Sequence, residues 1–144
     1  MYFVDRQKIE QILCFLEKQL DFLEKREMKD DYSKLAMERA VQTSIDAVLD
    51  VGNALIDGFI MRDPGSYEDI IDILLDEKVI AADAANQFKS ILPLRKMLVQ
   101  DYMEVSHERL EEGFNKSLPA FRTFPEVVRN YLTTELGPVS AFKN

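Results

Sequence analysis

The sequence has very few of the residues that build covalent or metal-bound frameworks. Among its 144 residues there is one cysteine, Cys14, one histidine, His107, and no tryptophan. A lone cysteine cannot close a disulfide within the chain, and one Cys with one His falls short of the ligand set of a zinc or iron site. Cys14 lies within an apolar helical pattern, so we expect a buried thiol. We therefore expect no disulfide framework and no metal or other cofactor.

Long apolar runs are missing as well. The most apolar stretch, residues 70–75, is interrupted by an acid, whereas a membrane-spanning helix needs about 20 apolar residues in succession. The first residues carry charges from Asp5 onward and lack the apolar segment of a secretory signal. At 47% hydrophobic residues, the chain can bury the core of one domain. We expect a cytoplasmic domain at 1–137 with no membrane contact, followed by a short tail at 138–144.

Cations are in deficit, with 18 Lys and Arg against 26 Asp and Glu and a net charge of −8. This balance opposes sequence-independent binding to RNA, because such binding depends on neutralising phosphates with Lys and Arg. One stretch differs from the rest: residues 84–100 contain three cations, Lys89, Arg95 and Lys96, and no acid. Any contact with RNA is therefore expected to be local to this stretch.

The apolar residues recur at steps of three and four, which predicts helices, and no alternating run predicts a strand. The pattern predicts an all-α bundle of about five to six helices with a long central helix. The fourth helix is expected to run through Tyr102 and to bend near Pro93, which lacks a backbone donor. The expected helices begin near Asp5, Asp30, Ser66, Ala82, Ser106 and Pro125.

Arg95 interrupts an apolar stripe of the fourth helix, formed by Phe88, Leu92, Val99 and Tyr102. A guanidinium on a buried stripe must be paired, because an unpaired buried charge is costly. Within the chain, Asp50 on the central helix is the expected partner, with Asp57 as a second candidate. A phosphate would also serve, because the planar fork of arginine binds phosphate through two hydrogen bonds. The residues alone leave the structural and the functional interpretation open.

The spacing of Arg95, Gln100 and Tyr102 resembles the Arg-x4-His-x-Tyr signature of the HepT-like branch of the HEPN superfamily. The resemblance extends over residues 5–136. It includes a polar pair on the central helix, here Asp50 and Asn53, and a Pro-x-Ser-Tyr turn within MRDPGSYEDI. That segment and the ending ELGPVSAF are similar to a YutE-type subgroup of the family.

The resemblance implies a dimer in which the motifs of two chains face each other and cleave RNA without a metal. Lys96 takes the place of the Asn or Asp that commonly follows the arginine, and Gln100 takes the place of the histidine. A neutral amide exchanges no proton near pH 7, and losing a proton-transfer group typically lowers a rate by about 10² to 10⁴. Tyr102 matches the tyrosine that an MNT-type nucleotidyltransferase antitoxin adenylylates in HepT-like toxins.

Helix geometry separates the motif residues. Five steps of about 100° place Gln100 about 140° around the helix from Arg95, whereas seven steps bring Tyr102 back to within about 20°. A site that uses both Arg95 and Gln100 therefore requires a distorted helix or two chains.

The sequence thus predicts a homodimeric HepT-like protein with a degenerate ribonuclease motif that binds RNA or nucleotide weakly, or acts as a regulator. Lys89 and Lys96 are its expected binding cations, and an MNT-type nucleotidyltransferase is an expected partner. One alternative is an active, metal-independent endoribonuclease toxin that uses Arg95. A second alternative is a non-enzymatic interaction module that binds partners through its helical faces.

Overall fold

The computed structural model describes residues 3–137 as a bundle of five α-helices without a strand. The all-α prediction is confirmed, and the predicted tail at 138–144 lies outside the described residues. Across the described part of the chain, no helix is both long and apolar enough to span a membrane. The helices are α1 (Arg6–Glu24), α2 (Asp31–Gly58), α3 (Tyr67–Asp76), α4 (Ala82–Val99) and α5 (His107–Leu136).

Side-chain caps fix four of the five helix starts. Asp5 accepts a hydrogen bond from the Lys8 amide at 3.0 Å, which begins α1. Asp30 and Ser33 form a reciprocal capping box at the start of α2. Ser66 and Ser106 cap α3 and α5, and the hydroxyl oxygen of each accepts a hydrogen bond from the backbone amide three residues later. Each such cap satisfies a backbone donor that the helix itself cannot pair.

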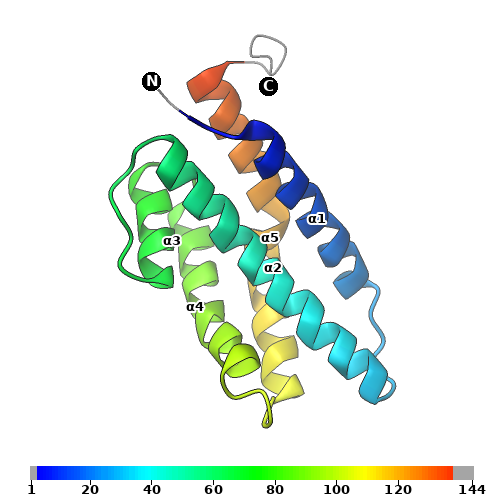
Figure 1. Ribbon diagram of the computed structural model, residues 1–144. Coiled ribbons are helices and arrows are strands. Elements are labelled where there is room, and N and C mark those ends of the chain that lie inside the picture. Colours follow the sequence, from blue (N-terminus) through cyan, green and yellow to red (C-terminus); the bar gives the residue numbers. More distant parts are fainter. Residues whose placement is uncertain (1–2, 138–144) are drawn as a thin grey trace.

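The helices pack as two antiparallel pairs with a short helix at one side (Figure 1). α1 packs chiefly on α2, α4 packs chiefly on α5, and α3 bridges α2 and α4. The central α2 also contacts α4 and α5, so it contributes to every layer of the core. Its fully buried side chains include Met37, Val41, Val51 and Leu55. Phe88, Phe114, Phe121 and Phe124 fill the space between α4 and α5.

Ion pairs from two arginines of α5 align this helix with α1. Arg129 donates hydrogen bonds to Glu10 and Glu17, at 2.7 and 3.0 Å. Arg122, two turns earlier on α5, ion-pairs with Asp21 further along α1. The hydrogen bond from Arg129 holds the pKa of Glu10 below its usual value. Because the pairs lie at two levels, they favour one register between the helices.

α5 is one continuous helix, whereas the sequence predicted a break and a sixth helix at Pro125. Pro119 and Pro125 both lie inside it, and each lacks the N–H that the helix would use. Gln87 of α4 compensates next to Pro119, because its side-chain carbonyl accepts from the Ala120 amide at 2.9 Å. That partner comes from another helix, so the local sequence gave no sign of it.

The predicted burial of Cys14 is wrong. Its side chain is exposed on α1, with the thiol 3.1 Å from a carboxylate oxygen of Glu10. The hydrogen bond to Glu10 raises the pKa of the Cys14 thiol, which keeps the group protonated. Leu13 and Leu16 take the core positions, and Cys14 lies about 100° around the helix from Leu13 and about 160° from Leu16.

Gly52 sets the distance between α2 and α3. A Cβ at this position would lie 2.6 Å from Ile70 Cγ2 and 3.3 Å from Leu74 Cδ1. The side chain of Ile70 branches at Cβ, so this methyl group cannot swing aside without moving α3. The missing side chain therefore lets α3 lie close against α2, which fixes where its first residue, Tyr67, is held.

We predict that Gly52→Ala lowers the free energy of unfolding by up to about 2 kcal/mol. Alanine gains about 1 kcal/mol in helix propensity, but overpacking of a close contact costs about 1–3 kcal/mol. Urea denaturation should show a lower midpoint with an unchanged slope. Gly65→Ala is the matched control, because its added Cβ meets Asp69 Oδ2 at an ordinary 3.8 Å. Equal or higher stability of Gly52→Ala would contradict the close-approach argument.

Candidate functional site

Arg95 joins three helices through two contacts. Its Nε donates to Asp46 Oδ1 of α2 at 2.7 Å, and its Cζ lies 4.5 Å from the ring centroid of Tyr67, the first residue of α3. The Arg95 and Asp46 side chains retain 21% and 31% of their exposure, so the pair is held at the surface and is not sealed in the core. The charge is thus paired, stacked and still reachable by solvent.

The predicted pairing of Arg95 with a carboxylate is correct, but the predicted partner, Asp50, is wrong. Asp46 and Asp50 lie one turn apart on the same side of α2, and α4 meets α2 at the level of the earlier one. The level at which two helices cross depends on packing far along the chain. The spacing along α2 does not encode it.

Loss of hydration and neighbouring charges shift the pKa values of Arg95 and Asp50. Loss of hydration acts to lower the pKa of Arg95, but Asp46 and Tyr67 outweigh it, and the pKa lies above its usual value. Loss of hydration and the neighbouring charge of Asp46 raise the pKa of Asp50, while Arg95 and Lys8 act to lower it. Arg95 therefore stays charged, whereas the charged form of the Asp50 carboxylate is disfavoured.

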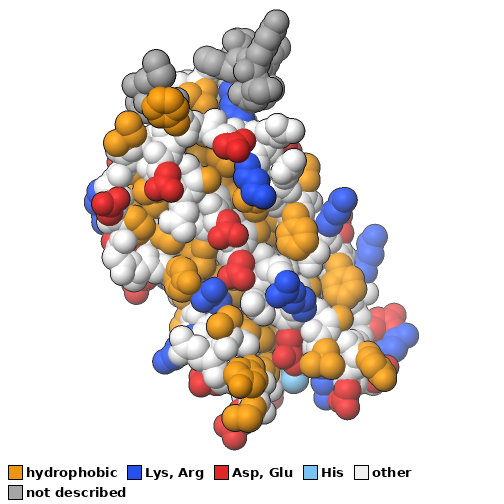
Figure 2. Space-filling view, viewed as in Figure 1, with side chains coloured by type: hydrophobic (Ala, Val, Ile, Leu, Met, Phe, Trp, Pro, Cys, Tyr) orange, Lys and Arg blue, Asp and Glu red, His pale blue; other side chains and the backbone are white. Residues whose placement is uncertain are grey.

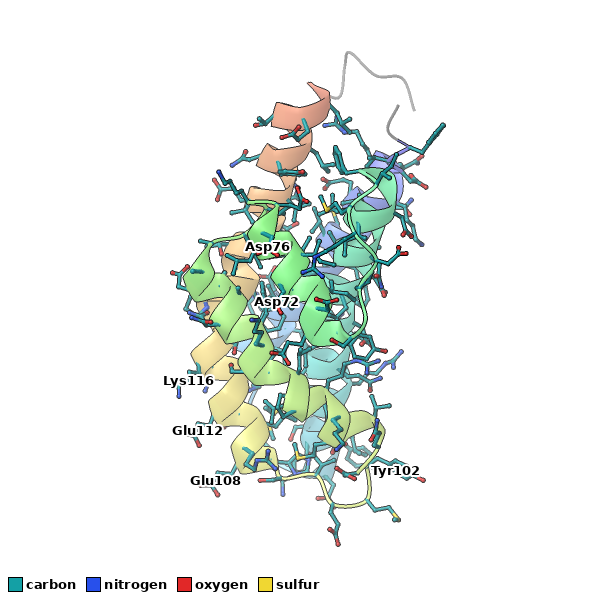
Figure 3. All side chains as sticks on the ribbon, turned by 90° about the vertical axis from the view of Figure 1, so that its left-hand side faces the viewer. Asp72, Asp76, Tyr102, Glu108, Glu112 and Lys116 are labelled. Atoms are coloured by element: carbon teal, nitrogen blue, oxygen red, sulfur yellow. The ribbon has the colours of Figure 1, made fainter. Side chains whose placement is uncertain are left out.

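Gln100 and Tyr102 do not join this cluster. α4 continues through Pro93 but ends at Val99, so its predicted extension to Tyr102 is wrong. Gln100 is the exposed C-cap, and Tyr102 lies in the following turn with 66% of its surface exposed. Figure 3 shows Tyr102 at the loop end of the bundle, directed away from the helices. Within residues 3–137, no hydrogen bond joins Arg95 to either residue.

The chain reverses after α4 because the start of α5 is anchored elsewhere. His107, its first residue, lies with Nε2 2.7 Å from Glu38 Oε2 of α2. The connection must therefore turn between Gln100 and Ser106, which ends α4 before Tyr102 can share the face of Arg95. The shared face expected for Arg95 and Tyr102 does not form.

The other predicted site residues are dispersed. Lys89 forms an ion pair with Asp72 of α3, which raises its pKa, so its charge is already partly neutralised. Lys96 is exposed near the end of α4 and has no ion pair among the described residues. Asn53 is exposed on α2, almost one turn beyond Asp50.

A groove between α1 and α2 lies beside the Arg95–Asp46 pair, and the sequence did not predict it. It has a volume of about 390 Å³ and is open to solvent. Figure 2 shows side chains of both charges, with apolar side chains between them, on this face of the molecule. Its lining is Lys8, Gln11, Ile12, Phe15, Arg39, Thr43, Asp46, Ala47 and Asp50. Asp46, Tyr67 and this groove are what sequence reasoning missed; the one available signal was Asp46, a turn before Asp50.

The described chain is an all-helical bundle whose fourth helix holds a charged, solvent-accessible arginine. The family described as "Ribonuclease HepT-like" matches residues 7–128. The chain therefore belongs to the HepT-like family of the HEPN superfamily, as its sequence motifs predicted.

Relatives fall into two groups. The Bacillus subtilis protein named "Putative RNase YutE" is 46% identical over 99% of this chain and all of its own length. A solved structure of YutE, described as a cytosolic protein of unknown function, superposes with a TM-score of 0.93 over the same shares. A tri-AMPylated Shewanella oneidensis HEPN toxin, solved in complex with MNT antitoxin, gives a TM-score of 0.75 at 17% identity. That match covers 85% of this chain and 96% of the toxin, and it shows the fold alone.

We predict that Asp50→Asn stabilises the protein at neutral pH. A carboxyl whose pKa is raised by folding costs stability above its folded pKa, and that cost disappears below the unfolded value of about 3.9. The gain should therefore be present at pH 7 and fade as the pH falls through the acidic range. Because Asp50 keeps contact with water, the gain should be small, on the order of 0.5 kcal/mol.

Thermal unfolding at several pH values measures the effect. Asp57→Asn, two turns further along α2 and equally exposed, controls for the loss of one negative charge from an acidic chain. A destabilised Asp50→Asn at pH 7, or a gain that grows toward low pH, would show that Asp50 is favourably placed instead.

Proposed function

We propose that this protein is a homodimer that binds RNA or nucleotide phosphates at Arg95 and has lost ordinary ribonuclease catalysis through Gln100. The observation that carries the proposal is the fixed presentation of Arg95: paired with Asp46, stacked on Tyr67 and still solvent-accessible. The ion pair uses Nε, which leaves the terminal guanidinium nitrogens outside that bond. A guanidinium held in advance loses less freedom when it binds a phosphate.

The separation of the motif residues supports the proposed dimer. α4 runs unbroken through Pro93, so helix distortion does not bring Gln100 round to Arg95. A shared site would then combine Arg95 of one chain with Gln100 of the other. Exposed apolar side chains at the end of α4 support this contact: Val99 keeps 40% of its exposure, Tyr102 66% and Met103 87%. Apolar surface of this kind is commonly covered in a two-fold dimer.

Two further features fit a HepT-like role. Lys96 lies exposed beside Arg95 in sequence and would add local positive charge, while Lys89 contributes less because Asp72 holds it. The exposed Tyr102 has the accessibility that adenylylation by an MNT-type nucleotidyltransferase requires. Such an enzyme is our proposed partner, and the cytoplasm the proposed location, by analogy with the solved toxin and with YutE.

An active ribonuclease is the second candidate, favoured by the name of the relative with 46% identity. In that case Arg95 would stabilise the charge that develops on the phosphate, and Gln100 would only position RNA. This function requires cleavage by the unmodified protein, which the first proposal does not.

We predict that Gln100→His raises cleavage of labelled total RNA at least about tenfold over the background of the unmodified protein. An imidazole restores a titratable group at the motif position, where such groups contribute about 10² to 10⁴ in rate. Adding Arg95→Gln should abolish the gain. Gln7→His, on an exposed position of α1, should leave cleavage at background. Arg95-dependent cleavage by the unmodified protein would support the second candidate, and no gain in a folded, dimeric Gln100→His would contradict the first.

We also predict a dimer with twice the chain mass of 16.7 kDa in sedimentation experiments at micromolar concentration. Met103→Glu should weaken association at least about tenfold, because it places a charge within a contact that excludes water. Ile60→Glu, at another exposed apolar residue, between α2 and α3, should leave the mass unchanged. A unit near 16.7 kDa would remove the shared site and favour a monomeric interaction module.

A further inference from the structure

We propose that the groove between α1 and α2 binds one nucleoside monophosphate whose base carries an amino group, either as a free nucleotide or as one residue of a single-stranded RNA. The RNA case rests on the function proposed for Arg95; the free nucleotide case does not. The groove volume of about 390 Å³ lies within the range of small-molecule sites, about 300 to 1,000 Å³.

The cations of the groove are unpaired. Seven of the eight arginines donate a side-chain hydrogen bond to another residue, and Arg39 is the exception among residues 3–137. Lys8, on the opposite helix, also has no hydrogen bond or ion pair from its side chain within the described chain. Two cations without a hydrogen-bonded partner therefore line one groove, where either can meet an anion.

The two acids of the groove, Asp46 and Asp50, differ in their hydrogen-bond partners. Asp46 is committed to Arg95, while the Asp50 carboxylate accepts no hydrogen bond within residues 3–137. An ionised carboxylate only accepts, so it pairs with amino groups and ring N–H groups and repels carbonyl oxygens. Guanine offers two adjacent donors, cytosine and adenine one amino group each, and uracil a single N–H between two carbonyls. We therefore expect guanine to bind best and uracil worst.

An aromatic surface completes the site. Phe15 of α1 lines the groove together with Ile12, and 44% of its surface is exposed. A single phenylalanine side chain at a partly open position offers a face on which a base can stack, as bases do in proteins that bind unpaired RNA. In the proposed complex, Lys8 or Arg39 binds the phosphate, Asp50 accepts hydrogen bonds from the edge of the base, and Phe15 stacks on the face of the base.

The position of the groove connects it with the Arg95 cluster. Asp46 is both the partner of Arg95 and a lining residue, so the two sites adjoin. A strand with one phosphate on Arg95 would bring a neighbouring nucleotide to the groove. The face in Figure 3 is less suited, because α5 presents Glu108 and Glu112 there beside Lys116. The cations Lys89 and Arg62 are already paired with Asp72 and Asp76 of α3.

Calorimetric titration with GMP, CMP, AMP, UMP and guanosine tests the proposal. We expect GMP to bind at least about fivefold more tightly than UMP, and guanosine to bind more weakly than GMP. Phe15→Ala should weaken GMP about tenfold, as expected for loss of a stacking surface. Phe22→Ala is the matched control, because Phe22 is similarly exposed on α1 and lies outside the groove. At least one of Lys8→Gln and Arg39→Gln should weaken GMP but not guanosine, because it removes the cation that binds the phosphate. Asp50→Asn should erase the preference over UMP.

Three outcomes would overturn the groove: no binding of any nucleotide or RNA by the unmodified protein, equal effects of Phe15→Ala and Phe22→Ala, or an unchanged base preference in Asp50→Asn. Thermal unfolding of each variant confirms that it is folded. A single-stranded U-rich RNA hexamer with one G separates the two sources. If Phe15→Ala weakens the hexamer, the groove binds RNA; if it weakens only GMP, the ligand is the free nucleotide.

The same titrations separate this proposal from the function at Arg95. If Arg95→Gln weakens the hexamer while every groove variant binds like the unmodified protein, the groove is refuted and the function at Arg95 stands. If groove variants lose GMP while Arg95→Gln binds the hexamer normally, the function at Arg95 is refuted and the groove stands as a nucleotide site.

Discussion

The ion pair between Arg95 and Asp46 is the constraint on which the site depends. It joins α4 to α2, and the stacking of the same guanidinium on Tyr67 adds α3. The stacking contact requires α3 to lie close against α2, which the missing side chain of Gly52 permits. The placement of Tyr67 therefore depends on core packing, and the two contacts together set the direction in which the positive charge faces. The position of the Arg95 side chain thus depends on the relative placement of three helices.

The cost of this arrangement explains why the pair lies at the surface. A fully buried ion pair loses more in hydration than it gains by attraction unless every polar atom is satisfied, and replacing it with apolar residues is often neutral or favourable. The Arg95–Asp46 pair avoids most of that loss because both side chains keep part of their exposure. Such a pair stabilises the fold only modestly. Its value is better explained by presentation of a charge than by stability.

The sequence predicted the kind of fold well and the geometry of the site poorly, for physical reasons. Periodicity, caps and turn residues are local, so the all-α class, five of the six helix starts and the family motif could be predicted, and only the start at Pro125 was wrong. The long-range features were not: Gln87 rescues α5 at Pro119 from another helix, and Asp46 displaces Asp50 because of the level at which α4 crosses α2. The end of α4 followed from the anchoring of His107 on Glu38. The partner of Arg95 and the end of α4 were therefore mispredicted because of contacts between residues distant in sequence, whereas the exposure of Cys14 follows from its position on α1.

Gln100 and the groove together bear on how the proposed site would select its ligands. Without a titratable group at Gln100, tight phosphate binding at Arg95 would give no chemical step by proton transfer, so affinity and base selection become the properties that matter. An acidic protein gains little from long-range attraction to RNA and must rely on short-range contacts. In the proposed groove site, Arg39, Lys8, the carboxylate of Asp50 and the exposed face of Phe15 would supply such short-range contacts. A protein of this charge should therefore distinguish its ligands by the base it receives more than by the number of phosphates it neutralises.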